Sequence, residues 1–177
     1  MTCLAGVEWE GGTFIGADSL TVAISGATCE GTKRPKVFRH GAYVVAIAGS
    51  SLAHNVIAHG AAWTPPPAKG DVMRHLVSVV VPEIRKVMAD AQWPADHSIN
   101  MLVAARGQLF EVAHDLCVSQ PRSGYAATGS AWQVALGSLF TSAHEDARER
   151  VMLALRAAAA HTPFVRGPYR VIYQRKP

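Results

Sequence analysis

Apolar residues along the 177-residue chain follow two patterns. In short segments they alternate with polar residues or form continuous runs, and in longer segments they recur every three or four residues. The short segments predict strands and the longer ones predict helices. One of them, Tyr43–Ala48, is a nearly continuous apolar run, which is typical of a buried strand. The expected strands cover residues 2–7, 13–17, 36–40, 43–48, 99–105, 109–113, 116–119, 124–130 and 169–173, with a further short strand or an extended loop over 19–28.

Small polar residues mark where the helices should begin. Ser50 or Ser51 can cap one helix, Asp71 can cap the longest one, and Gly129-Ser130 is a helix start of the same kind as Gly49-Ser50. The expected helices cover residues 52–59, 72–91 (with a kink or break at Pro82), 131–142 and 144–160, and the proline-rich segment 63–70 should be a surface loop.

The order of these elements is strands, two helices, strands, two helices and a final strand. Paired helices and two groups of strands favour an α+β domain with sheet packed on sheet inside and helices outside. A chain of 177 residues can bury a sizeable core, and neither a linker nor an internal repeat divides it. We therefore expect a single domain over residues 1–177.

Composition narrows the classes of protein that fit. Apolar residues make up 49% and charged residues 17%, which excludes a disordered chain. The net charge of +4 is mild and no basic stripe is interleaved with aromatic residues, so we expect no nucleic-acid partner. The sequence has no apolar stretch long enough to span a membrane and no secretory signal pattern, so we expect a cytoplasmic protein without a membrane partner.

Cysteine and histidine spacing predicts neither a disulfide framework nor a metal site, and we expect no cofactor. The three cysteines are widely spaced, and Cys3 and Cys117 fall in apolar segments where a thiol is usually a buried hydrophobe. His54 and His59 are five residues apart, so they do not share a helix face.

Thr2 is the residue with the most distinctive potential chemistry. Removal of Met1 would give Thr2 a free α-amine beside its own hydroxyl, which is one way to activate a weak hydroxyl nucleophile. The amine can accept the hydroxyl proton because its pKa of about 7.7–8 lies near working pH. The structural alternative is that Thr2 is only the first residue of a strand.

Several short motifs occur in a fixed order along the chain. They are T-x-x-x-x-V from Thr2, G-x-x-x-G-A-D-S from Gly12, K-V-F from Lys36, A-x-A-G-S from Ala46 and A-x-G-S from Ala127. In this order they resemble the proteasome β-subunit family of N-terminal nucleophile (Ntn) hydrolases, and most closely the bacterial HslV-type peptidases. The resemblance covers essentially the whole chain. It implies a four-layer αββα sandwich with two mainly antiparallel sheets between helix layers.

The resemblance also implies a role for five residues. Thr2 matches the nucleophile, Lys36 the lysine beside it and Asp18 the carboxylate that holds this lysine. The backbone N–H of Gly49 matches the oxyanion donor, and Ser130 matches the serine that hydrogen-bonds near the terminal amine. The implied reaction is acyl transfer to the Thr2 hydroxyl followed by hydrolysis of the ester.

The implied partners are a peptide or protein substrate, further copies of the chain in a homo-oligomer and an ATPase unfoldase. The sequence departs from the family's pattern at two places, which fits a divergent or phage-type member of that family. The family's second, late Asp is absent from segment 157–162, and Ala131 replaces a glycine after Ser130. Three alternatives stay open, namely a non-catalytic protein of this fold used in assembly, a small-amide hydrolase with the same Thr2, and structural roles for Lys36 (a solvated charge) and Asp18 (a turn cap).

Overall fold

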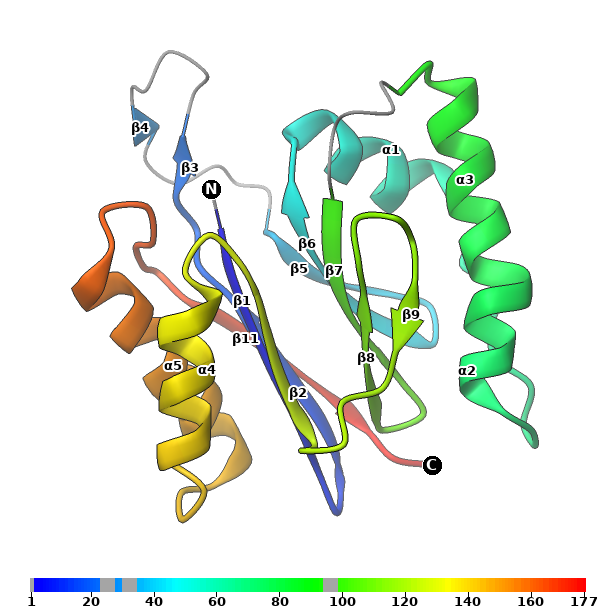
Figure 1. Cartoon of the computed structure of the whole chain (residues 1–177). Helices are drawn as coiled ribbons and strands as arrows, with labels where there is room; N and C mark the ends of the chain where they lie inside the picture. Colours follow the sequence, from blue (N-terminus) through cyan, green and yellow to red (C-terminus); the bar gives the residue numbers. More distant parts are fainter. Residues whose placement is uncertain (1, 23–27, 30–34, 94–98) are drawn as a thin grey trace.

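The computed structural model describes residues 2–22, 28–29, 35–93 and 99–177. Over these residues the chain forms four layers, with two sheets face to face and helices covering each outer side (Figure 1). This arrangement confirms the predicted α+β sandwich. The four-stranded sheet has the order β10–β1–β2–β11, in which all pairs are antiparallel, and its strands are β1 (Cys3–Trp9), β2 (Gly12–Ala17), β10 (Tyr125–Gly129) and β11 (Arg170–Arg175).

The second sheet is also antiparallel throughout, in the order β5–β6–β7–β8–β9. Its strands are β5 (Val37–His40), β6 (Tyr43–Gly49), β7 (Ile99–Ala105), β8 (Gln108–Val112) and β9 (Val118–Ser119). Segment 19–28 contributes a separate short pair, in which β3 (Thr21–Val22) lies antiparallel to β4 (Thr28–Cys29), and its positions 23–27 lie outside the described residues.

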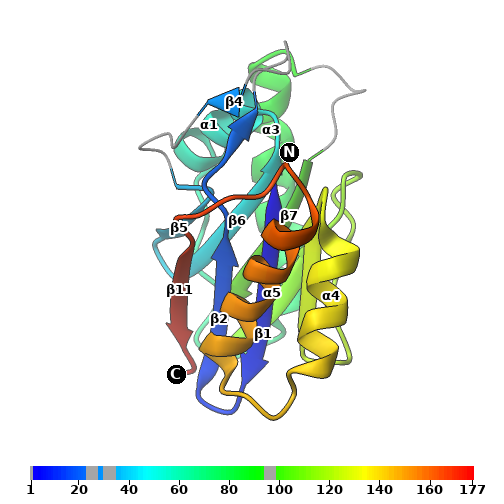
Figure 2. The same ribbon diagram turned by 90° about the vertical axis from the view of Figure 1, so that its left-hand side faces the viewer.

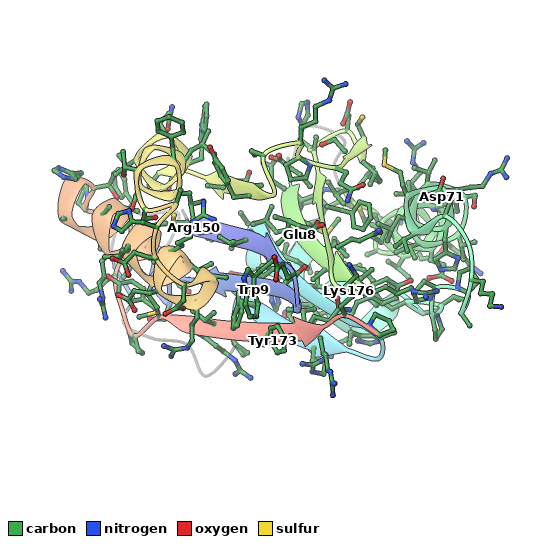
Figure 3. All side chains as sticks on the ribbon, turned by 90° about the horizontal axis from the view of Figure 1, so that it is seen from below. Glu8, Trp9, Asp71, Arg150, Tyr173 and Lys176 are labelled. Atoms are coloured by element: carbon green, nitrogen blue, oxygen red, sulfur yellow. The ribbon has the colours of Figure 1, made fainter. Side chains whose placement is uncertain are left out.

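The helices form two outer layers. Helices α4 (Trp132–Thr141) and α5 (Ala147–His161) lie side by side over the four-stranded sheet (Figure 2). The five-stranded sheet is covered by α1 (Ser51–Gly60), α2 (Val72–His75), the π-helical turn η1 (Leu76–Val80) and α3 (Val81–Asp90). Figure 3 shows the two outer layers on opposite sides, with Arg150 of α5 on one and Asp71, the α2 cap, on the other.

Side chains alternate between the two faces of each strand, and this produces three apolar layers between the two sheets and the two helix layers. In β1, Cys3 and Ala5 face the α4–α5 layer, whereas Leu4 faces the other sheet. Gly16 in β2 allows α5 to lie close, because a Cβ at this position would be only 2.5 Å from the Val151 side chain. These layers fix how the two sheets sit on one another.

Hydrogen bonds tie the two sheets together at the end away from the N-terminus. Seen from below, Figure 3 shows Glu8 there between the sheets, and its carboxylate accepts the Leu109 N–H at 2.8 Å. The Thr13 hydroxyl donates to the Gly107 carbonyl at 2.6 Å, and the Gly107 N–H donates to the Gln174 side chain at 2.8 Å. These bonds fix the sheets at this end, while the strand ends that carry the candidate residues lie at the other.

The helix expected over 72–91 runs from Val72 to Asp90 and is interrupted by a π-helical turn. The π-helical turn η1 separates α2 from α3, and Pro82 lies at the N-terminal end of α3. Proline has no N–H to donate and its ring crowds the carbonyl four residues earlier, which a wider π-helical turn relieves. The kink or break expected at Pro82 is a π-helical turn just before the proline, and the backbone at its two junctions stays right-handed helical.

The prediction that the last helix begins at His144 was wrong by three residues. The Asp146 side chain accepts the N–H groups of Arg148 at 3.0 Å and Glu149 at 2.9 Å, so Asp146 caps α5 and the helix begins at Ala147.

The strand expected over 116–119 is shorter than predicted, because only Val118–Ser119 pairs with β8. Leu116 has a φ of 66°, a turn conformation that cannot belong to a strand. Cys117 is therefore exposed, contrary to the expectation that it is buried. Among the helices of the described ranges, none has the length and apolar character needed to cross a membrane.

Candidate active site

The five candidate residues all lie at strand ends on the side of the molecule where the N-terminus lies (Figure 1). Antiparallel pairing explains this, because it brings the start of one strand beside the end of its neighbour. Thr2 precedes β1, Asp18 follows β2 and Ser130 follows β10, and these three strands are adjacent in one sheet. Lys36 precedes β5 and Gly49 ends β6, which pair in the other sheet.

Asp18 organises the site. Its side chain is almost completely buried, with 2% of the residue exposed. One carboxylate oxygen accepts the Cys3 N–H at 2.9 Å and the other accepts the Leu20 N–H at 3.0 Å. Both oxygens also accept from Lys36 Nζ, at 2.9 and 3.0 Å. The bond to Leu20 is the turn contact considered from the sequence, but it is one of four.

Lys36 forms a largely buried ion pair with Asp18, and its side chain is only 13% exposed. Its Nζ also donates to the Leu20 carbonyl at 2.6 Å. Burial lowers the pKa of Lys36, and the charge of Asp18 and its hydrogen bond to the ammonium oppose that effect. Lys36 is therefore not the solvated surface charge that the sequence left open.

Ser130 binds the backbone of Thr2. The Thr2 backbone N donates to Ser130 Oγ at 3.3 Å, while the Ser130 hydroxyl and N–H both donate to the Thr2 carbonyl, at 3.3 and 2.8 Å. Gly129 permits this approach, because a Cβ on this residue would lie 2.1 Å from the Thr2 carbonyl oxygen and its φ is 98°. Thr2 is 5% exposed.

The expected helix start at Gly129-Ser130 was wrong in its detail. Ala131 occupies the N-cap position of α4 and no side chain caps this end. The Ser130 side chain bonds Thr2 instead. The other Gly-Ser pair behaves as predicted, since Ser50 accepts the Leu52 N–H at 3.2 Å and caps α1.

The thiol of Cys3, the residue after Thr2, is a poor nucleophile. Its thiol is fully buried, and burial followed by the negative charge of Asp18 raises its pKa to about 12. Because the thiolate is the reactive form, this cysteine does not compete with Thr2 as a nucleophile near neutral pH.

The backbone N–H of Gly49 lies on the edge of β6 that faces β5 and Lys36. The Ile47 N–H donates to the Lys36 carbonyl at 3.0 Å, and alternate residues of a strand direct their N–H groups to the same side. The N–H of Gly49 therefore points to the Lys36 side of β6, one step beyond that bond. Its φ of 140° is a conformation that favours glycine.

Backbone groups complete the site, and sequence reasoning missed them. The Leu20 carbonyl serves as an additional acceptor for Lys36, and the Arg166 carbonyl accepts the Ser19 N–H at 3.1 Å. Arg166 lies in the segment after α5. Backbone groups occur in every residue, so no sequence signal could have identified these two. Among the described residues, no three His, Cys, Asp or Glu side chains are grouped in a way that could hold a metal ion.

The structure of this chain resembles those of several known proteins. It resembles BPH from Thiobacillus denitrificans, solved in complex with epoxomicin, at 25% identity and a TM-score of 0.83 over 99% of this chain and 100% of that one. It resembles HslV from Trypanosoma brucei at 14% identity and a TM-score of 0.74, over 98% of this chain and 99% of that one. The Anbu complex from Pseudomonas aeruginosa, described as a helical assembly, matches at 15% identity and a TM-score of 0.72, over 98% of this chain and 81% of that one.

These likenesses define the class of protein by its fold. The chain has the proteasome-like Ntn-hydrolase fold, with two antiparallel sheets between helix layers. Sequence comparison adds no closer assignment, since no protein-family model matches the chain and no curated protein matches it significantly.

Proposed function

We propose that this protein is a threonine peptidase that uses Thr2 as its N-terminal nucleophile after Met1 is removed. The observation that carries the proposal is the position of the Thr2 backbone between two fixed polar groups. Ser130 holds the Thr2 N and carbonyl, and the Asp18–Lys36 pair holds the next N–H along the chain.

The chemistry follows from this arrangement. Without Met1, the Thr2 nitrogen is an amine 3.3 Å from Ser130 Oγ. In its neutral form the amine accepts the hydroxyl proton as Thr2 Oγ adds to a peptide carbonyl. The C–N bond of the substrate then breaks, the leaving amine takes the proton, and an ester on Thr2 remains. Water adds to this ester and releases the acid, which restores the hydroxyl.

Two further groups have supporting roles in the proposal. The ammonium of Lys36 favours the neutral form of the neighbouring amine, because two like charges in a poorly solvated site repel. The Gly49 N–H stabilises the negative charge that develops on the carbonyl oxygen. Assembly into a homo-oligomer, an ATPase unfoldase that supplies unfolded chains, and a cytoplasmic location complete the proposal. Assembly is supported by the Anbu complex of the same fold.

An epoxyketone is the sharpest probe of the mechanism, and BPH was solved with epoxomicin. The reaction we expect needs both functional groups of Thr2, since Oγ adds to the ketone carbon and the terminal amine opens the epoxide. Intact mass should show loss of Met1 and a gain of one probe mass. Thr2→Ala removes the hydroxyl but keeps a small second residue, so it should lose Met1 and remain unlabelled.

Ser130→Ala tests the hydrogen bond to Thr2. Loss of a bond worth about 1 kcal/mol should slow labelling roughly fivefold, with Ser123→Ala, at an exposed serine, as the matched control. Labelling that persists in Thr2→Ala would rule out Thr2 as the nucleophile. Retention of Met1 in every preparation would instead favour the non-catalytic assembly protein, an alternative supported by the lack of a carboxylate in segment 157–162.

A further inference from the structure

Trp132 is a large apolar residue that stays on the surface beside the candidate active site. It is the first residue of α4 and lies two positions after Ser130, whose side chain bonds Thr2. The residue is 44% exposed, and within the described ranges it belongs to none of the three apolar clusters. The packing of the core therefore gives no reason for a tryptophan at this position.

The direction of α4 indicates which surface the Trp132 side chain covers. The helix begins at the end of the molecule where the N-terminus lies and runs away from it (Figure 1). Side chains of an α-helix lean toward the N-terminal end of that helix. The inward positions of α4 are taken by Ala135 and Leu139, which pack against the four-stranded sheet. The indole of Trp132 therefore covers surface near Ser130 rather than surface farther along α4.

A second exposed aromatic residue lies at this end of the molecule. Phe164 is 38% exposed and belongs to the segment between α5 and β11. Two residues later, the Arg166 carbonyl accepts the Ser19 N–H at 3.1 Å, which holds this segment beside the end of β2 that carries Asp18. Trp132 and Phe164 thus both lie where the four-stranded sheet connects to its helix layer, and both leave apolar surface open to solvent there.

The proposed reaction brings one half of the substrate to this side of Thr2. The carbonyl oxygen of the scissile bond faces the Gly49 N–H, which belongs to the other sheet. The leaving amine takes its proton from the Thr2 nitrogen, and that nitrogen lies 3.3 Å from Ser130 Oγ. Proton transfer needs the two nitrogens within about 3 Å of each other. The residue after the scissile bond therefore comes close to Ser130, and Trp132 is two residues farther along the chain.

We propose that Trp132 is a specificity-determining residue for the leaving half of the substrate, the part of the peptide after the scissile bond. Its indole contacts an apolar side chain on the first residue of that half. A charged side chain finds no opposite charge on α4, since none of the ten residues of this helix is charged. The inference rests on the proposed function and names the substrates that the Thr2 site selects.

Partitioning of the Thr2 ester between water and an added amine tests this assignment. A peptide ester supplies the acyl group, and either leucinamide or glycinamide competes with water for it. The acceptor amine adds to the ester carbonyl, a C–N bond forms as the bond to Thr2 Oγ breaks, and the proton of the amine passes to that oxygen. The acceptor occupies the place of the leaving half, so the leucinamide-to-glycinamide product ratio, measured by mass spectrometry, reports on that half alone.

We expect the wild type to favour leucinamide about tenfold, the preference that corresponds to removing about 50 Å² of apolar surface from water. Trp132→Ala should lower the ratio to about one, and Trp132→Phe should keep most of the preference because it retains an aromatic ring. The matched control is Trp9→Ala, at a tryptophan that is 56% exposed at the opposite end of the molecule (Figure 3), and it should keep the wild-type ratio. Circular dichroism melting shows that each variant is folded.

Three results would overturn the role of Trp132 while leaving the peptidase proposal intact. They are a wild-type ratio near one, a Trp132→Ala variant that keeps the wild-type ratio, and a Trp9→Ala variant that loses the preference to the same extent. Each is read in protein that the epoxyketone labels at Thr2, because the probe has no leaving half. A wild type that is not labelled and forms no ester overturns both proposals, so the two failures are distinguishable.

Discussion

Replacing Asp18 by Asn tests how much the site depends on the buried ion pair. The substitution keeps the shape of the side chain but removes its charge, so the largely buried Lys36 ammonium loses the counter-charge of Asp18. The new amide N–H₂ also faces a group that donates, either Lys36 Nζ or a backbone N–H. Breaking a buried pair on one side typically costs 3–5 kcal/mol, and we expect about 3 kcal/mol here because Lys36 keeps its bond to the Leu20 carbonyl.

A loss of about 3 kcal/mol is roughly a 150-fold change in the folding equilibrium. For a chain of this length it lowers the melting temperature by roughly 6–12 °C. Urea titration should show it as a lower midpoint with an unchanged slope. The control, Glu10→Gln at an exposed carboxylate, should stay within about 0.5 kcal/mol of the wild type.

The double variant Asp18→Asn with Lys36→Met measures how much of the stability loss comes from the interaction between the two side chains. Removing both charges leaves neither one buried alone, so the double variant should lose less than the sum of the two single losses, by about 1–3 kcal/mol. Additive losses, or a loss below 1 kcal/mol for Asp18→Asn, would refute the assigned role of the ion pair.

Two further predictions concern the neighbours of Thr2. Gly129→Ala should displace the Thr2 carbonyl and abolish probe labelling. The control is Gly41→Ala, also at positive φ but with open space around it, and it should leave labelling intact. Equal labelling of the two variants would contradict the close approach of Gly129 to Thr2. In the folded protein at pH 8, iodoacetamide should modify Cys117 and spare Cys3, because a thiol with a pKa of about 12 is only about 0.01% thiolate at that pH. The Cys3 rate should rise about tenfold per pH unit, and peptide mapping that finds Cys3 modified as fast as Cys117 at pH 8 would contradict its burial.

Local pattern was enough to predict most of the elements. Apolar runs such as Tyr43–Ala48 and the caps at Ser50 and Asp71 are properties of neighbouring residues, and the structure confirms them. The errors fell where competing local signals were equally plausible. Asp146 could equally be a cap or a first-turn residue, and Cys117 lies in an apolar segment that the turn at Leu116 interrupts.

The sequence by itself determined that Thr2, Asp18, Lys36 and Ser130 each lie where a strand begins or ends, because strand periodicity stops at these residues. Only the tertiary structure decided that those ends meet. Ser130 bonds Thr2 across 128 positions of sequence and Lys36 bonds Asp18 across 18, and both contacts depend on how strands pair and how the two sheets pack. Periodicity describes a segment and its own faces, whereas such contacts depend on the packing of distant segments, which no local pattern encodes.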